Sequence, residues 1–560
     1  MGILPEQVGR DAQATEMQND PPIIIEGPEQ SHLDPALPDG GLPPYPGVQS
    51  YQVFRASRDV PELTDGKGWT YHHHVDMACW KGRLYVGWNS CERDEDVWPS
   101  RELYSTSIDG RTWTDPVELF PQGVSTPLRM YFFHAANGRM LAIAGMRLDT
   151  ADTDEDRKGP LVVREIRADH TLGNVHALQG AGAPPHFDRS HDADFVAACR
   201  QLLADGVFLE QQDRGKLLGE RRMKWHDAAA WPQGSVPGDN EKWVAGKAYS
   251  FFRRPDGLVI GMSKMGWTTT SRDHGETWTQ PSVPPTLVTG KAKVWSQQTR
   301  DGRFALVYNP SQRNRYPLAI VTGDDGRTFR DMRIVQGELP VQRYAGMHRS
   351  IGPQYVRGIS HWADDGSRAD ERAMWLVYSM NKEDIWVSRV PLGATPDAWN
   401  VYSPKWAPVT AEGDEVRLED RDPYDDAVAT RVFDDGGGAG DASAVSFDVF
   451  AEQPGVTLHA ELIDRTGRST PIPIEAEATG RWQSYRFEAA QPARITFRTG
   501  PPRGVGGTRP VPPGTDKPLI PIAFRIRRVR VTLRLQAANA RLRDLEVTFH
   551  VAPRNMVAGR

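Results

Sequence analysis

Short segments of alternating apolar and polar residues recur through the middle of the chain, and each follows a tight turn that usually contains glycine. The clearest are residues 81–89 (KGRLYVGWN), 137–145, 257–264 and 301–309; residues 205–213 are weaker, and residues 374–382 lack the glycine. Each segment has the length of one strand, and their spacing suits four-stranded blades. Six such signals predict a six-bladed β-propeller. Seven blades are the alternative, because residues 150–245 are long enough to contain another.

The segments on either side of these strands complete the predicted propeller, which extends over residues 49–395. The early strand at 51–57 and the late strand at 384–392 are expected to share the closing blade and so join the ends of the ring. Residues 1–48 are rich in proline and glycine and predict an extended arm, with one short strand at residues 23–25. Apolar residues at three-four spacing in DADFVAACRQLLADG predict a helical insertion near residues 190–206.

The pattern changes after residue 395, where residues 396–408 predict a proline-bounded linker. Residues 409–560 then contain strands of period two with few helix signals between them, which indicates a β-sandwich accessory domain. The fold class is therefore all-β, a propeller followed by a sandwich. One late strand, FRIRRVRVTLRLQ at 524–536, places most of its arginines on one face. We interpret it as a solvated edge or interface strand, with binding of an acidic glycan as the alternative.

Composition adds limits to this picture. A net charge of −6 gives no reason to expect nucleic acid or a membrane as a partner, and no apolar run is long enough for a transmembrane helix. The start of the chain has no signal-peptide pattern, so either a leader has been removed or the protein is cytoplasmic. We expect the first, a secreted or periplasmic protein. Of the three cysteines, Cys79 and Cys91 could bridge a hairpin, but small buried thiols are the simpler interpretation. The oligomeric state stays open.

A Ser-x-Asp-Gly-x-Thr-Trp turn closes residues 107–113 and recurs at 271–278 (SRDHGETW) and 322–329 (TGDDGRTF). Its carboxylate can accept hydrogen bonds from the turn backbone, its glycine permits positive φ, and its aromatic residue fills the space between strands. These turns resemble the Asp-boxes, or BNR repeats, of sialidase-like β-propellers. The resemblance covers residues 70–390 and implies that Asp109, Asp273 and Asp324 are structural residues at the periphery.

The first blade begins with YHHHVD at residues 71–76, and the histidine cluster does not recur. Sialidases share an Arg-Ile-Pro start, an arginine triad and a Tyr/Glu nucleophile pair, whereas this chain has histidine where the first arginine is expected and no Arg-Ile-Pro at all. The histidine-rich blade is more similar to Asp-box propeller enzymes that act on rhamnose–glucuronate linkages, which include glycosidases and polysaccharide lyases. A second histidine that some propeller lyases have is replaced here by the region of Asn89, Ser90 and Cys91.

Histidine is the first candidate for acid–base chemistry because it titrates near neutral pH. On an extended strand His72 and His74 share one face and His73 takes the other. The candidate catalytic residues are His72, His73, His74, His348 and Tyr355. Arginine, lysine, amide and aromatic side chains at strand ends could bind an acidic sugar. These substrate-binding candidates are Asn89, Arg147, Lys224, His226, Lys264, Trp267, Asn309, Arg313, Arg315, Arg357 and Lys382.

Two further groups of residues have alternative interpretations. Glu383 and Asp384 could form an acid–base pair, but a salt-bridged turn is preferred. The three adjacent histidines could alternatively bind a metal, but no partner spacing is evident, so the metal content stays open. No cofactor is required by the sequence, and a structural cation such as calcium is a further alternative.

Together these residues predict a carbohydrate-active enzyme that cleaves a terminal glycosidic linkage in an acidic, uronate-containing polysaccharide or oligosaccharide. A rhamnose–glucuronate linkage fits the resemblance. Cleavage would proceed by histidine-assisted β-elimination or by hydrolysis. The alternatives are an exo-sialidase-like hydrolase and a non-catalytic glycan-binding propeller.

Overall fold

The computed structural model describes most of the chain between residues 21 and 537. The described residues are 21–27, 33, 38–95, 97–121, 130–147, 158–179, 184–211, 248–290, 292–311, 315–359, 372–393, 398–412, 415–419, 425–433, 442–451, 456–476, 481–488, 492–499 and 528–537.

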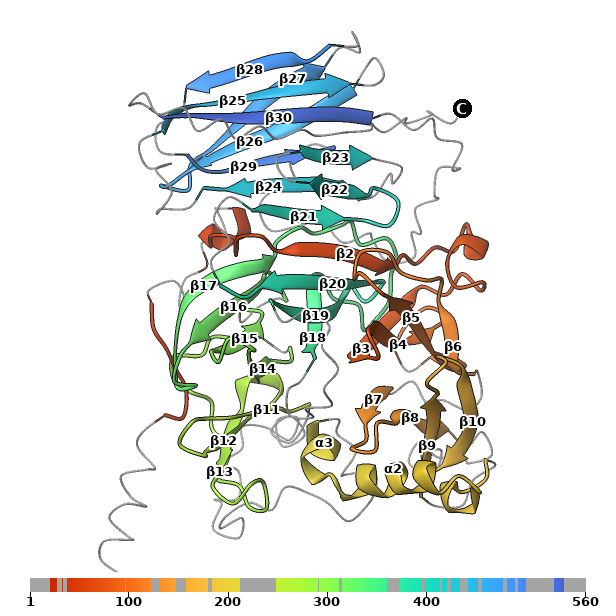
Figure 1. Ribbon diagram of the computed structural model, residues 1–560. Coiled ribbons are helices and arrows are strands. Elements are labelled where there is room, and N and C mark those ends of the chain that lie inside the picture. Colours follow the sequence, from red (N-terminus) through yellow and green to blue (C-terminus); the bar gives the residue numbers. More distant parts are fainter. Residues whose placement is uncertain are drawn as a thin grey trace, which may run out of the picture.

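Five antiparallel sheets follow one another around a ring (Figure 1). The first two each contain four strands: β3 (Tyr71–Trp80), β4 (Arg83–Cys91), β5 (Ser100–Ser107) and β6 (Val117–Phe120), then β7 (Tyr131–His134), β8 (Met140–Arg147), β9 (Lys158–Ile166) and β10 (Leu172–Ala177). The third contains β11 (Ser250–Arg253), β12 (Val259–Met262) and β13 (Thr268–Ser271). The fourth contains β14 (Trp295–Gln298), β15 (Phe304–Tyr308), β16 (Leu318–Gly323) and β17 (Thr328–Gln336).

The fifth sheet closes the ring with strands from both ends of the propeller. It contains β18 (Pro353–Gly358), β19 (Ala373–Met380), β20 (Asp384–Pro391) and the early strand β2 (Gln49–Phe54), which pairs antiparallel with β20. The predicted closing blade is therefore confirmed. The short strand predicted in the N-terminal arm is also present, because β1 (Ile24–Ile25) pairs parallel with β17.

Hydrogen bonds between the innermost strands hold neighbouring blades together. The Asp76 carboxylate on β3 accepts a hydrogen bond of 2.9 Å from the backbone of Phe132 on β7. Ser250 on β11 and Ser296 on β14 share a buried hydroxyl contact of 2.8 Å. Such buried polar contacts add directional constraints to the apolar packing between blades.

The predicted count of six or seven blades is not confirmed, since the described residues form five blade sheets. Five of the six strand signals are the second strands of these blades, β4, β8, β12, β15 and β19. The weak signal at 205–213 was wrong: it forms the helix α3 (Gly206–Gln211), with the Asp205 carboxylate accepting a hydrogen bond of 2.8 Å from the backbone of Phe208. This N-cap favours a helix over a strand.

The predicted helical insertion is confirmed as α2 (Ala193–Ala204), whose Asp192 N-cap accepts hydrogen bonds from the backbone of Asp194 and Phe195. The two helices α2 and α3 lie between the second and third blades (Figure 1). Single turns of 3-10 helix occur at Pro38–Gly41, Pro61–Leu63, Phe187–Arg189 and Lys264–Gly266. No helix in the described ranges is long and apolar enough to cross a membrane.

The expected linker contains a strand that joins the propeller to the sandwich. β21 (Trp399–Ser403) pairs parallel with β2, so the closing sheet continues through β24 (Val428–Val432), β29 (Pro492–Arg498), β26 (Val456–Asp464) and β27 (Ser469–Ala476) as one nine-stranded sheet. The second sandwich sheet contains β22 (Val409–Glu412), β23 (Glu415–Glu419), β30 (Arg528–Ala537), β25 (Ala442–Ala451) and β28 (Gln483–Glu488). In Figure 1 the sandwich lies above the ring. The strand expected at 542–551 and the start of the arginine-rich strand lie outside the described residues.

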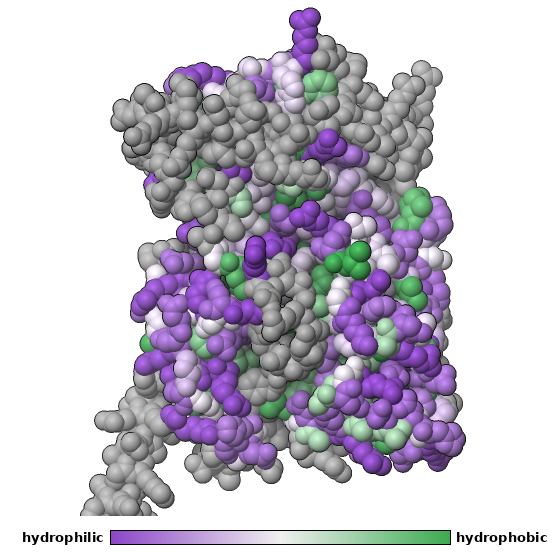
Figure 2. Space-filling model, in the orientation of Figure 1, coloured by the Kyte–Doolittle hydropathy of each residue, from purple (hydrophilic) through white to green (hydrophobic). Residues whose placement is uncertain are grey.

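Buried apolar residues and ion pairs fix the junction between ring and sandwich. Trp399 and Val401 of β21 share one core cluster with Ile385 and Val387 of β20. Arg498 on β29 makes two hydrogen bonds of 3.0 Å with the Glu338 carboxylate, which follows β17. Where the residues are coloured in this view, the surface is mainly hydrophilic, with apolar residues in small groups (Figure 2).

The repeated Asp–Gly turns have the geometry expected from their residues. The Asp109 carboxylate accepts hydrogen bonds from the backbone N–H groups of Arg111 and Thr112, at 2.9 and 2.8 Å. The Trp113 indole donates to the Gly110 carbonyl at 3.1 Å. The turn at 271–278 has the same bond from Trp278 to Gly275 at 3.0 Å. The shorter copy is thus as complete as the longer one.

The third turn requires one correction. Asp325, and not Asp324, accepts the backbone hydrogen bonds, at 2.8 Å from Arg327 and 2.7 Å from Thr328. Asp325 precedes the glycine directly, as Asp109 does. The cysteines Cys79, Cys91 and Cys199 are buried and form no disulfide, so the alternative of a hairpin bridge was wrong.

The two adjacent aspartates at the third turn provide an internal comparison. We expect Asp325→Ala to lower the free energy of unfolding by about 1–2 kcal/mol, because it leaves two turn N–H groups without their acceptor. Asp324→Ala, at an exposed position in the same turn, should change the free energy by less than about 0.5 kcal/mol. Urea denaturation measures both. Equal effects would contradict the assignment of Asp325.

Candidate functional site

Two neighbouring inner strands contain β-bulges, and each bulge holds a non-glycine residue at positive φ. On β3 the register shifts between His73 and Asp76, and His74 has φ 55°. On β18 it shifts between Gln354 and Arg357, and Tyr355 has φ 58°. A left-handed conformation in such residues costs about 1–3 kcal/mol, so the surrounding packing must impose it. Bulges of this kind re-aim side chains and are frequent at functional sites.

The side chains of these bulges meet inside the ring. The ring centroids of His73 and Tyr355 are 4.4 Å apart, those of His74 and Tyr355 5.5 Å, and those of the two histidines 4.5 Å. All three residues are buried. The cluster therefore combines two imidazoles and a phenol from blades that are distant in sequence.

Three cations surround the Tyr355 ring. Lys293, Arg315 and Lys264 lie 4.8, 4.9 and 5.4 Å from its centroid, respectively. Burial alone would raise the pKa of the Tyr355 phenol, but the charges of Lys264 and Arg315 outweigh it and hold the pKa below its ordinary value of 10. The Arg315 guanidinium is itself held by the Ser350 hydroxyl at 3.2 Å and by Gln354. Tyr355 therefore has an environment that stabilises a phenolate.

A carboxylate lies on the other side of the cluster. Glu95 accepts from His74 Nε2 at 3.0 Å and from Lys382 Nζ at 2.5 Å. Burial raises the pKa of Glu95, yet these two partners lower it well below its ordinary value. Asn381 and Lys382 both have positive φ, the pattern of a type I′ hairpin turn between β19 and β20, and this turn positions the lysine.

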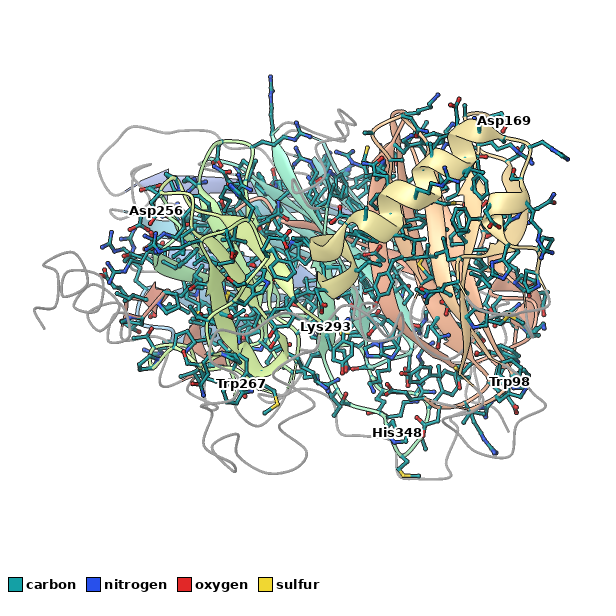
Figure 3. All side chains as sticks on the ribbon, turned by 90° about the horizontal axis from the view of Figure 1, so that it is seen from below. Trp98, Asp169, Asp256, Trp267, Lys293 and His348 are labelled. Carbon is teal, nitrogen blue, oxygen red and sulfur yellow. The ribbon has the colours of Figure 1, made fainter. Side chains whose placement is uncertain are left out.

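The cluster belongs to one face of the ring. Lys264, Arg315 and Lys382 lie in the connections that follow the second strands of the third, fourth and fifth blades. Figure 3 views the ring from its edge, with His348, Trp267 and Trp98 at the lower rim, Lys293 deeper, and Asp169 and Asp256 at the opposite rim. Because equivalent connections in a propeller reach the same face, residues that are far apart in sequence converge here.

The buried polar atoms without a hydrogen-bond partner among the described residues include one atom of the cluster and one of a residue beside it. These two are Nε2 of His73 and the hydroxyl oxygen of Tyr71. The other ring nitrogen of His73 contacts the Ser379 hydroxyl at 2.5 Å. Burial lowers the pKa of His73 well below 6.5, and the neighbouring His74 and Lys382 lower it further, so the imidazole is neutral at neutral pH. Two cations lie near the Tyr71 ring, Arg349 at 5.4 Å and Lys382 at 5.7 Å from its centroid.

His72, a predicted catalytic candidate, has a different environment. Its Nε2 donates to the Trp69 carbonyl at 2.8 Å, and its Nδ1 accepts from the Trp88 indole at 3.1 Å. Both ring nitrogens are occupied by protein groups, and burial lowers its pKa to about 4. This geometry corrects the candidate to a neutral, structural histidine.

Several predicted binding residues bond the protein itself. The Asn309 amide donates to the carbonyls of Pro317 and Pro353. The Arg357 guanidinium donates to the carbonyls of Tyr249 and Gln211. Their hydrogen bonds favour structural roles.

The remaining candidates are distributed over the rim and beyond the described residues. Asn89 donates to the Glu102 carboxylate at 3.1 Å. His348 is about half exposed, with its Nδ1 3.8 Å from Asp94. Trp267 lies at the rim (Figure 3). Lys224, His226, Arg313 and the side chain of Arg147 lie outside the described residues.

The preferred interpretation of Glu383 and Asp384 as a salt-bridged turn is confirmed. Asp384 bonds Arg55 at 2.9 Å and also Arg343, while Glu383 accepts the backbone N–H groups of Arg343 and Tyr344. All four charged side chains are buried.

Sequence reasoning missed Glu95, Lys293 and Tyr71. Lys293 precedes an inner strand, and Tyr71 is two residues before His73 on the same strand face, which was an available signal. Glu95 lies among other acidic residues in ERDED, and nothing in that pattern distinguishes it. Among the described residues no group of three or more His, Cys, Asp or Glu is arranged to hold a metal ion.

A cavity of about 140 Å³ lies elsewhere, between ring and sandwich. Its lining includes Arg494 and Arg498, which pair with Asp39 and Glu338 across the junction. These charges neutralise one another and hold the two domains together. The cluster around Tyr355 is the better candidate site, because Nε2 of His73 and the hydroxyl of the neighbouring Tyr71 are buried without a hydrogen-bond partner and the backbone at His74 and Tyr355 is strained.

The buried position of His72 has a consequence for stability at low pH. Its pKa falls from 6.5 in the unfolded chain to about 4 in the fold, so the unfolded state takes up a proton first as pH falls. Stability is lost from pH 6.5 to pH 4, by up to about 3 kcal/mol. His72→Gln should remove the part of this pH-dependent loss of stability that is due to His72. Denaturation at a series of pH values measures it. His348→Gln, at the exposed rim, is the control; an unchanged pH slope in His72→Gln would refute the assignment.

Comparisons with known proteins agree with this architecture. Residues 23–127 and 124–215 match the family described as "Beta-prop_BT_1020:-like, N-terminal beta propeller", and residues 399–483 match "Sialidase-like, CBM domain". No curated protein sequence matches the chain.

Solved structures extend the comparison. A structure titled "Sialidase" is 27% identical with a TM-score of 0.75; the match covers 92% of this chain and 54% of that one, so this chain spans about half of that protein. A Trypanosoma rangeli sialidase mutant displaying trans-sialidase activity is 10% identical, with a TM-score of 0.37 and coverage of 92% and 94%. Trypanosoma rangeli sialidase in complex with sialic acid is 11% identical, with a TM-score of 0.36 and coverage of 88% and 96%. The resemblance to sialidase-like β-propellers is confirmed, and it extends to a sialidase-like carbohydrate-binding domain.

Proposed function

We propose that the chain is a glycoside hydrolase that releases a terminal sugar bearing a carboxylate, with Tyr355 as the nucleophile. The observation that carries the proposal is the environment of Tyr355, a strained phenol with three cations around its ring. The similarity to a solved structure titled "Sialidase" and to a sialidase-like carbohydrate-binding domain supports it.

The charge of the site selects the substrate class. Lys264, Lys293 and Arg315 can hold a carboxylate beside the phenol, since arginine and lysine form charge-assisted hydrogen bonds with carboxylates. Uronates, including a glucuronate linked to rhamnose, and sialates share this group. We propose the uronate-containing glycan as the first substrate to test and the sialoside as the second.

The reaction would take place in two displacements. The Tyr355 phenolate attacks the anomeric carbon while the bond to the leaving oxygen breaks, which gives a glycosyl-tyrosine. His74, oriented by its 3.0 Å bond to Glu95, is the group that would carry the proton to the leaving oxygen. Water then displaces the sugar from Tyr355. We propose that the protein is secreted or periplasmic and acts on glycans there.

The contact between Tyr355 and His73 also supports β-elimination as a second candidate. The cations would neutralise a uronate carboxylate and acidify the adjacent C–H, and the phenolate or imidazole would remove the proton. The products separate the two reactions. Hydrolysis in isotopically labelled water incorporates one labelled oxygen, whereas elimination incorporates none and creates an unsaturated uronate with ultraviolet absorbance.

Replacement of the nucleophile tests the proposal directly. Tyr355→Phe should reduce turnover of the responsive oligosaccharide at least about thousandfold while binding, measured by calorimetry, is retained. Tyr131→Phe, a buried tyrosine on the inner strand β7, is the matched control. Full activity in Tyr355→Phe would exclude Tyr355 as the nucleophile. Binding without turnover in the wild-type protein would favour the non-catalytic glycan-binding alternative.

The charge of Lys264 should set the pH dependence of the reaction. Lys264→Met removes the largest of the charges that lower the pKa of Tyr355, so that pKa should rise. Because the phenolate is the reactive form, the rising limb of the pH–rate profile should move to higher pH. An unmoved limb, with activity retained, would show that Tyr355 does not titrate in the reaction.

A further inference from the structure

We infer that Tyr71 and His73 together hold the water molecule that hydrolyses the glycosyl-tyrosine. This inference rests on the proposed function and deepens it, by assigning the second half of the reaction to two residues of β3. Tyr71 is not among the residues that the sequence motifs select.

The first observation is their shared orientation. Residues two apart on a strand lie on the same face, and the rings of Tyr71 and His73 are 6.0 Å apart in an edge-on arrangement. The ring of Tyr355 lies 4.4 Å from that of His73, and the Tyr355 phenol is near enough to Tyr71 to affect the pKa of its hydroxyl. A group held by Tyr71 and His73 would therefore lie close to Tyr355.

The second observation is the hydrogen-bonding state of the pair. The Tyr71 hydroxyl and His73 Nε2 are both buried and without a protein partner. A buried polar group is costly to leave unpaired, and two neighbouring ones of complementary type point to a small polar ligand that bonds both. Tyr308 offers a contrast, because its buried hydroxyl also lacks a partner but belongs to an apolar cluster of the fourth blade.

The donors and acceptors of the pair suit a nucleophilic water. His73 Nδ1 lies 2.5 Å from the Ser379 hydroxyl. In the tautomer that donates Nδ1–H to this hydroxyl, His73 presents the lone pair of Nε2. Tyr71 remains a donor, because burial raises its pKa well above 10. A water between them donates one proton towards Nε2 and accepts the Tyr71 O–H, which leaves its second lone pair for attack.

The chemical step balances with these groups alone. The water oxygen forms a bond to the anomeric carbon, and the bond from that carbon to the Tyr355 oxygen breaks, with its electron pair returning to the phenolate. The water proton moves to His73 Nε2 and passes to solvent when the sugar leaves. The cations around Tyr355 stabilise the departing phenolate.

The test measures formation and hydrolysis of the glycosyl-tyrosine separately in the Tyr71→Phe variant. The probes are the 4-methylumbelliferyl glycosides of glucuronate and of N-acetylneuraminate, used with the full chain. We expect the first turnover, read as a burst of aglycone, to keep its rate while steady-state turnover falls about a hundredfold. The glycosyl-Tyr355 adduct should then accumulate and be detected by mass spectrometry. Tyr308→Phe is the control and should leave both phases unchanged.

Three outcomes would overturn the inference: a Tyr71→Phe variant with unchanged steady-state turnover, an equal loss in the burst and the steady state, or no adduct. A crystal structure of the wild-type protein supplies a readout that does not need turnover. An ordered water bonded to both Tyr71 and His73 is expected there and should be absent from Tyr71→Phe. Its absence from the wild type overturns the inference, whereas a wild-type protein inactive on every acidic glycan contradicts the proposed function instead.

Discussion

A buried group of four charges, Arg55, Arg343, Glu383 and Asp384, is the interaction on which the site geometry depends. It connects the end of β2, the segment between β17 and β18, and the turn between β19 and β20. Buried ion pairs add little net stability, but removal of one partner is strongly destabilising because the other charge is left buried without a counter-ion. The group therefore acts as a geometric constraint. It fixes the turn that presents Lys382, and Lys382 in turn orients Glu95 and His74.

The electrostatics of the cluster follow from this framework. Cations gather on the side of Tyr355, whereas the carboxylate of Glu95 is engaged by His74 and Lys382 on the other. A phenol in this position loses its proton more easily than one in water, although burial opposes ionisation. The pKa of the His73 imidazole is lowered as well, first by burial and then by neighbouring positive charges, so this ring stays neutral. The positive field therefore favours the deprotonated form of both groups, which for the phenol is an anion and for the imidazole the neutral ring.

The strand pattern of the sequence predicted the ring well, because each blade begins with a tight turn followed by a buried alternating strand. It failed at 205–213, where Asp205 caps a helix with a similarly apolar pattern. The convergence of Lys264, Arg315 and Lys382 was predictable, since they follow equivalent strands. Which of His72, His73 and His74 lie in the cluster could not be predicted from the sequence. A bulge in β3 changes the alternation of side chains between the two faces of the strand, and the assignment relies on that alternation. Glu95 acquires its role from partners distant in sequence.

The nine-stranded sheet that runs from β18 at the centre of the ring to β27 in the sandwich has a mechanical consequence. Two domains joined by a flexible linker sample many separations, and the linker's entropy sets how often a chain held by one reaches the other. Here hydrogen-bonded strands replace such a tether, with β21 paired directly to β2. A polysaccharide held on the sandwich would therefore meet the mouth of the ring at a single registered distance. The shortest glycan that could contact both domains at once would then be determined by the fixed distance between them, which the paired strands set.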